Sequence, residues 1–70
     1  MDPDRLLQAL NDRGLEAVMV ERAQGGGGRT VITVDGGWVE LVEGESKVEG
    51  TDFETLILVQ EAIREQLQTF

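Results

Sequence analysis

The first apolar pattern along the chain is helical. Asp2 followed by Pro3 is typical of a helix N-cap and a first helical residue, because an aspartate oxygen accepts a hydrogen bond from an unpaired amide and proline needs no donor there. Three leucines within residues 6–10 then recur at helical spacing. Gly14 stands where many helices end in a left-handed conformation. The pattern predicts an amphipathic helix from residue 2 to about residue 13.

The three segments that follow have the composition and period of strands: residues 15–23, 29–35 and 38–43. Residues 25–28 are four glycines. Glycine loses more backbone entropy on ordering than any other residue, so this run predicts a flexible hairpin tip. Asp35-Gly36 predicts the next, tighter turn. Short connections favour pairing between neighbouring strands, so the segments predict an antiparallel meander.

A second helix is predicted at the C-terminal end. Residues 44–50 are polar and predict a loop, and Thr51 with Glu54 three residues later forms a capping-box pattern that begins a helix running to about residue 69. Leu58 falls on the side of this helix that carries several glutamates. The other apolar residues predict a broad core-facing stripe that consists of Phe53, Leu56, Ile57, Ile63, Leu67 and Phe70.

These elements predict one α+β domain that spans residues 1–70. Their order is α-β-β-β-α, with the N- and C-terminal helices packed on one face of a three-stranded antiparallel sheet. This arrangement leaves the second face of the sheet without a cover.

The predicted strands are apolar on both of their faces. Val18 and Val20 alternate with other apolar residues, and Trp38 does the same in the third strand. A sheet with one solvated face alternates cleanly between apolar and polar residues, so the pattern favours cover on both faces. Two interpretations stay open: an interface with a second copy or a partner protein, or incidental exposure of several valines. Trp38, the only tryptophan, fits either an interface hot spot or a core position.

The small size of the chain limits its core. A domain of this length buries about 60% of the surface that its unfolded form exposes. The chain has no cysteine and no histidine, so it has no disulfide and no transition-metal site is expected. Association is the reinforcement that remains. Absence of cysteine fits a reducing cytosol, and no run approaches the roughly 18 apolar residues of a membrane span, so we expect a cytoplasmic protein without membrane or cofactor.

The charge is strongly negative. The chain has 14 acidic and 6 basic residues, a net charge of -8, and residues 35–54 hold seven acids and only Lys47. This charge repels phosphate backbones and anionic lipids, so direct nucleic-acid binding is not expected. A row of carboxylates can instead mimic a nucleic acid and bind a basic protein surface, or the acids can serve solubility alone.

Catalytic and nucleotide-binding patterns are missing. The glycine run precedes a predicted strand rather than a helix N-terminus, so it does not match a phosphate-binding loop. Arg22 and Arg29 flank it, and a small anion site there competes with the simpler interpretation of two solvated arginines. Without histidine or cysteine, no nucleophile has an adjacent base. We therefore expect no enzyme activity and no small-molecule substrate.

The remaining interpretation is a non-enzymatic protein-interaction module, either an inhibitor or a nucleic-acid mimic that binds a basic protein. The alternative is a self-associating, dimeric structural or accessory subunit whose acidity serves solubility. The predicted binding surface combines the uncovered sheet face with neighbouring acids, and it consists of Trp38, Val18, Val20, Glu40, Glu43 and Glu45.

Overall fold

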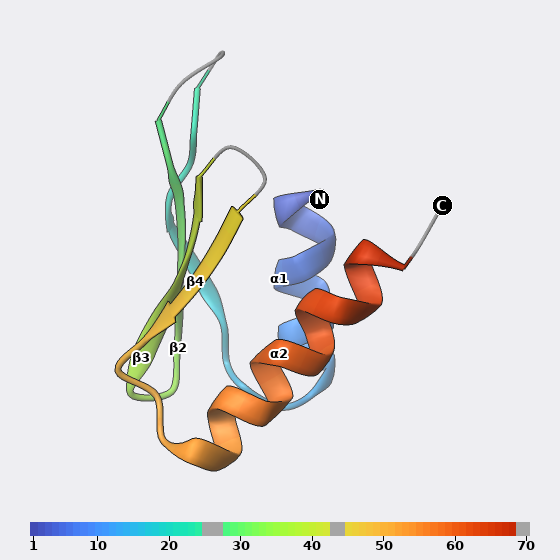
Figure 1. Cartoon of the computed structure of the whole chain (residues 1–70). Helices are drawn as coiled ribbons and strands as arrows, with labels where there is room; N and C mark the ends of the chain where they lie inside the picture. The colour runs from blue at the N-terminus through green and yellow to red at the C-terminus, as the bar shows by residue number, and fades with distance from the viewer. Residues whose placement is uncertain (25–27, 43–44, 69–70) are drawn as a thin grey trace.

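A computed structural model describes residues 1–24, 28–42 and 45–68 (Figure 1). The elements are α1 (Pro3–Asp12), β1 (Val18–Glu21), β2 (Thr30–Val34), β3 (Gly37–Val42), β4 (Glu45–Glu49) and α2 (Phe53–Leu67). The predicted α+β class is confirmed. The predicted three-stranded meander is wrong, because the sheet has four antiparallel strands in the order β1-β2-β3-β4.

The additional strand is β4, in the segment predicted to be a polar loop. Its residues are mostly exposed, and Val48 is the one that packs against the core. An edge strand needs few apolar residues, since its backbone hydrogen bonds with β3 hold it in place. Of the predicted glycine tip, residues 25–27 lie outside the described residues.

α1 begins as the sequence predicts. Asp2 is the N-cap, and its carboxylate accepts a hydrogen bond from the Asp4 amide at 2.9 Å. The helix buries Leu6, Ala9 and Leu10.

The connection from α1 to β1 is held by one amide side chain. The Asn11 Nδ2 donates to the Ala17 carbonyl oxygen at 3.1 Å, and the Ala17 N–H donates to Asn11 Oδ1 at 2.7 Å. Both bonds are partly buried. Between these residues Glu16 adopts a positive φ of 48°, so the loop does not follow a regular backbone path.

We expect Asn11→Ala to lower the free energy of unfolding by about 1 to 3 kcal/mol, because it leaves the amide and the carbonyl of Ala17 without partners. Urea unfolding followed by circular dichroism measures the change. The matched control is Gln8→Ala, which removes an exposed side-chain bond to Asp12 and is expected to change stability by less than about 0.5 kcal/mol. Equal unfolding midpoints for the two variants would contradict this role of Asn11.

α2 differs from its prediction at its start and in its buried face. Its N-cap is Asp52 rather than Thr51, because the Asp52 carboxylate accepts the Thr55 N–H at 2.7 Å. This hydrogen bond holds the pKa of Asp52 below its usual value. Of the predicted core stripe, Ile63 is buried, whereas Phe53, Ile57 and Leu67 are exposed; Phe70 lies outside the described residues. The residues that α2 does bury are Thr55, Val59, Ala62 and Ile63.

Leu58, which the pattern placed away from the core, packs against it. α2 is apolar around most of its circumference, so its own sequence allows two buried stripes. Contacts with the rest of the fold select between them.

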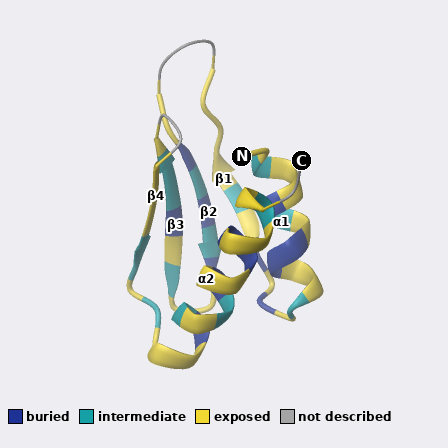
Figure 2. Cartoon of the chain, turned by 45° about the vertical axis from the view of Figure 1, so that its right-hand side comes forward, coloured by how far each residue is buried: buried dark blue, intermediate teal, exposed yellow. Residues whose placement is uncertain are grey.

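Figure 2 shows the buried residues gathered between the sheet and the two helices. In β2 the buried positions alternate with half-buried ones, so Thr30, Ile32 and Val34 share the buried face. We call this the inner face of the sheet and the opposite one the outer face. The core cluster consists of Leu6, Ala9, Leu10, Leu15, Ala17, Ile32, Val34, Val39, Val59, Ala62 and Ile63.

Candidate functional site

Strand register determines which side chains share the outer face. Thr33 of β2 is opposite Val18 of β1 on one side and Trp38 of β3 on the other, and Trp38 is in turn opposite Glu49 of β4. The next row contains Glu21, Val31, Glu40 and Lys47. Successive side chains of a strand alternate between faces, so both rows lie on the outer face.

Two of the three apolar residues predicted to bind a partner lie on this face. Val18 is 55% exposed and Trp38 is 41% exposed, and only the Thr33 position separates them across the sheet. Trp38 is therefore not a core residue, which removes one of its two sequence-based interpretations. Its ring reaches toward Gly50, where an added Cβ would lie 3.6 Å from Trp38 Cζ3.

Val20 occupies a special position in β1. The pairing of β1 with β2 shifts between Met19 and Glu21, which makes Val20 the extra residue of a β-bulge. It is 59% exposed. The bulge means that simple alternation does not assign Val20 to a face of the sheet.

The charged residues of the outer face are largely paired. The Arg29 Nε bonds Glu21 at 2.8 Å, and its Nη1 contacts Glu40 at 3.3 Å. The hydrogen bond to Glu21 makes the largest contribution to raising the pKa of Arg29. Lys47 pairs with Glu49 at 3.1 Å. Positive and negative side chains thus alternate across this surface.

The predicted acids therefore have different surroundings. Glu40 lies on the same face as Trp38, but it is half-buried and engaged by Arg29. Glu45 is exposed at the start of β4, opposite Val42. Glu43 lies outside the described residues.

Sequence reasoning missed Glu21, Arg29, Lys47 and Glu49 as members of this surface. Glu40 was among the predicted residues, and alternation counted from Trp38 places it on the same face. The residues of β4 had no such signal, since their segment was predicted to be a loop.

The small anion site considered for Arg22 and Arg29 is not formed by the described residues. Arg22 bonds Asp4 of α1 at 2.7 Å, whereas Arg29 turns to the outer face. The hydrogen bond from Arg22 makes the largest contribution to lowering the pKa of Asp4. The two arginines thus serve separate ion pairs.

Both edges of the sheet discourage the addition of another strand. β1 carries the bulge, and β4 carries the exposed Glu45 and Lys47 and the half-buried Glu49 along its length. Bulges and charged side chains are the usual protection of edge strands. A partner is therefore more readily accepted on the outer face than along an edge.

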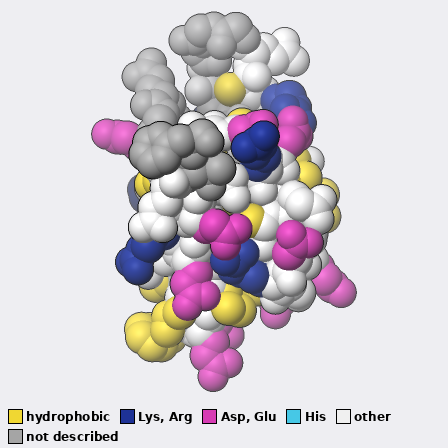
Figure 3. Space-filling view, turned by 90° about the vertical axis from the view of Figure 1, so that its right-hand side faces the viewer, with side chains coloured by type: hydrophobic (Ala, Val, Ile, Leu, Met, Phe, Trp, Pro, Cys, Tyr) yellow, Lys and Arg dark blue, Asp and Glu magenta, His cyan; other side chains and the backbone are white. Residues whose placement is uncertain are grey.

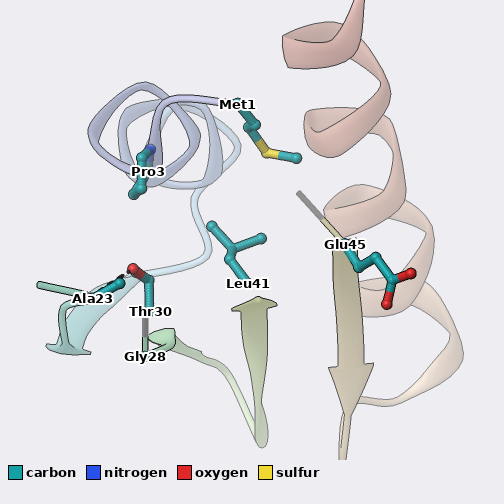
Figure 4. Close-up of a pocket in the computed structure, with 7 residues that line it drawn as sticks. All are labelled: Met1, Pro3, Ala23, Gly28, Thr30, Leu41 and Glu45. Carbon is teal, nitrogen blue, oxygen red and sulfur yellow. Dashed lines mark hydrogen bonds between the residues drawn. The ribbon is translucent and has the colours of Figure 1, made fainter. Parts of the chain in front are cut away.

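A pocket of about 160 Å³ lies at the end of the sheet beside the start of α1 (Figure 4). Met1, Pro3 and Leu41 supply apolar surface, and the Thr30 hydroxyl accepts the Ala23 N–H at 3.1 Å. The Glu45 carboxylate points away from the other labelled side chains. These lining residues bring no acid, base and nucleophile together.

In residues 1–24, 28–42 and 45–68, no three acidic, histidine or cysteine side chains come close enough to hold a metal ion. No helix within the same ranges has the length and apolar character needed to cross a membrane.

Comparisons of the chain with protein-family models, with curated proteins and with solved structures find no match. The interpretation of the outer face therefore depends on its own residues.

Proposed function

We propose that this chain is a non-enzymatic protein-interaction module whose binding surface is the outer face of its sheet. The observation that supports this most directly is the pair Val18 and Trp38, two large apolar side chains exposed on either side of Thr33. Tryptophan is enriched among the residues that dominate binding energy. In this proposal both helices cover the inner face alone, on the side of the sheet where Figure 1 shows them.

The partner that fits this surface has an apolar centre and a basic rim. The chain carries a net charge of -8, and the exposed Glu45 lies at the β4 side of the face. Such charge accelerates association with a basic protein. Glu40 has a second role in this proposal, since it also holds Arg29 on the same face.

A strict nucleic-acid mimic receives less support than general binding to a basic surface. Mimicry needs an unbroken row of carboxylates, and on β4 Lys47 separates Glu45 from Glu49 and pairs with the latter. We therefore favour a basic protein surface that recognises Trp38 and Val18 as well as the charge. We expect this binding to take place in the cytoplasm.

The second candidate function is self-association as a structural or accessory subunit. The observation that favours it lies on α2, where large apolar residues are exposed on the side away from the core. This possibility concerns a separate surface.

We expect Trp38→Ser to weaken binding to the partner at least about thirtyfold, the effect of losing a hot-spot residue worth about 2 kcal/mol. Parallel capture from an extract of the source cells with wild type, Trp38→Ser and Leu67→Ser identifies proteins that depend on Trp38. Leu67→Ser is the matched control, since it removes an exposed apolar side chain from α2. Calorimetry then measures the affinity of any purified candidate.

Glu45→Gln is expected to slow association a few-fold at low salt and to reduce its salt dependence.

Equal retention of every captured protein by wild type and Trp38→Ser would reject the outer face as the binding surface.

A further inference from the structure

α2 exposes a second apolar stripe on the side away from the core. Phe53, Ile57 and Leu67 are 73%, 40% and 59% exposed. Gln60 and Arg64, also exposed, lie between them along the helix. Figure 3 views the helix side of the molecule and shows hydrophobic side chains protruding at its lower end, where α2 begins. We call these five residues the α2 stripe.

The spacing of the α2 stripe is that of a helix-pairing seam. Its successive members are four, three, four and three residues apart. This alternation is the pattern by which two helices pack along their length with side chains interdigitated. A helix with the same spacing is therefore the best-matched occupant, and α2 of a second copy has that spacing.

Charge selects the relative direction of the two helices. In a parallel pair, Arg64 of one copy would lie beside Arg64 of the other, which is unfavourable. In an antiparallel pair, Arg64 lies instead near the start of the other helix, where Phe53 offers an aromatic face and Glu54 a carboxylate. Within the described part of a single copy, Arg64 has no ion pair.

We propose that two copies of this chain associate through antiparallel α2 helices, with the α2 stripe of each packed against that of the other. One helix per copy makes an interface at the low end for specific complexes, below about 1,200 Å² in total, so we expect a reversible dimer rather than a permanent one. The α2 stripe points away from the sheet, so this dimer leaves both outer faces free. The inference does not depend on the function proposed for the outer face.

Sedimentation equilibrium of the full chain, from low micromolar to millimolar concentration, tests the proposal. We expect a monomer–dimer equilibrium for wild type, and an increase of the dissociation constant by at least about tenfold for Phe53→Glu and for Leu67→Glu. Val20→Glu is the control, because it places the same charge on an exposed valine of the sheet. It is expected to leave the dimer intact. Circular dichroism verifies that each variant is folded.

The direction of the helices is tested by charge exchange and cross-linking. Arg64→Glu is expected to weaken the dimer about tenfold, and the double change Arg64→Glu with Glu54→Arg to restore it. The chain has no cysteine, so a single introduced thiol forms disulfides only between copies. Gln60→Cys, at the centre of the stripe, is expected to cross-link on mild oxidation. Gln68→Cys is not, because antiparallel packing separates the two thiols by about 24 Å along the helices.

Three results would overturn the proposal: a monomer at every concentration, a dimer that persists in folded Phe53→Glu and Leu67→Glu, or a dimer abolished by Val20→Glu alone. Cross-linking at Gln68 as efficient as at Gln60 would reject the antiparallel direction.

Discussion

Gly37→Ala is expected to remove most of the free energy of unfolding of this chain. A Cβ at Gly37 would overlap the carbonyl oxygen of Glu49 and would lie 2.8 Å from the backbone nitrogen of Thr51. Both neighbours are backbone atoms, which cannot rotate away as a side chain can. Removal of this overlap would require β3 and β4 to separate at the end of their pairing where Trp38 lies opposite Glu49.

The expected loss is about 3 kcal/mol, at the upper end of the cost of inserting atoms into a packed site. A domain of this size has a net stability of only roughly 3 to 5 kcal/mol, so about 2 kcal/mol or less of it remains. Circular dichroism and urea unfolding measure both quantities.

Gly14→Ala separates this clash from backbone strain. Gly14 has a φ of +79° with nothing within 4 Å of its added Cβ, so alanine there is strained without a collision. We expect it to lower stability by about 1 kcal/mol and to remain folded. A Gly37→Ala variant as stable as Gly14→Ala would show that the β3–β4 contact adjusts more easily than its geometry implies.

The contact at Gly37 also matters for the outer face. The pairing of β3 with β4 places Glu49 opposite Trp38, and the turn at Gly50 lies beside the tryptophan ring. Partial loosening of β4 would therefore change the surroundings of Trp38.

The second large effect is expected for Val59→Glu in α2. Val59 is fully buried in the core cluster, and a carboxylate there would have no buried ionic partner, since the buried residues in the described part of the chain are apolar apart from Thr30 and Thr55. Burying an unpaired charge costs several kcal/mol, more than a small domain can lose. The variant is expected to be unfolded at neutral pH.

Phe53→Glu provides the contrast on the same helix. Phe53 is 73% exposed, so the same substitution meets water and leaves the fold intact. The unfolding transitions of the two variants, followed by circular dichroism, measure the difference. A folded Val59→Glu together with an unfolded Phe53→Glu would mean that α2 buries the stripe first predicted from its sequence.

Phe53 and Val59 show why the buried face of α2 could not be predicted from its sequence. Apolar residues surround most of α2, so helical spacing alone admits two buried faces. The prediction from hydrophobicity placed the larger side chains, including Phe53 and Leu67, in the core. Packing against the core instead buries Thr55, Val59 and Ala62, because smaller residues allow a helix to approach its neighbours closely.

The apolar part of the candidate site was predictable, whereas the ion pairs of its charged residues were not. The apolar pattern of the strands marked Val18 and Trp38, and the structure places them on either side of Thr33 on one exposed face. The ion pairs of Arg29 join residues from three segments. No spacing along the sequence reveals such pairs, since they depend on strand register.

Local chemistry determined the start of α1 at Asp2 and Pro3, the turn at Asp35-Gly36, and the apolar segments that contain β1, β2 and β3. Each of these follows from the conformational preference of a few adjacent residues. Tertiary structure decided that the polar residues of β4 form a strand, which face of α2 is buried, and that Trp38 is exposed. These outcomes depend on backbone pairing and packing between segments distant in the chain, and nearest-neighbour preferences carry no information about such contacts.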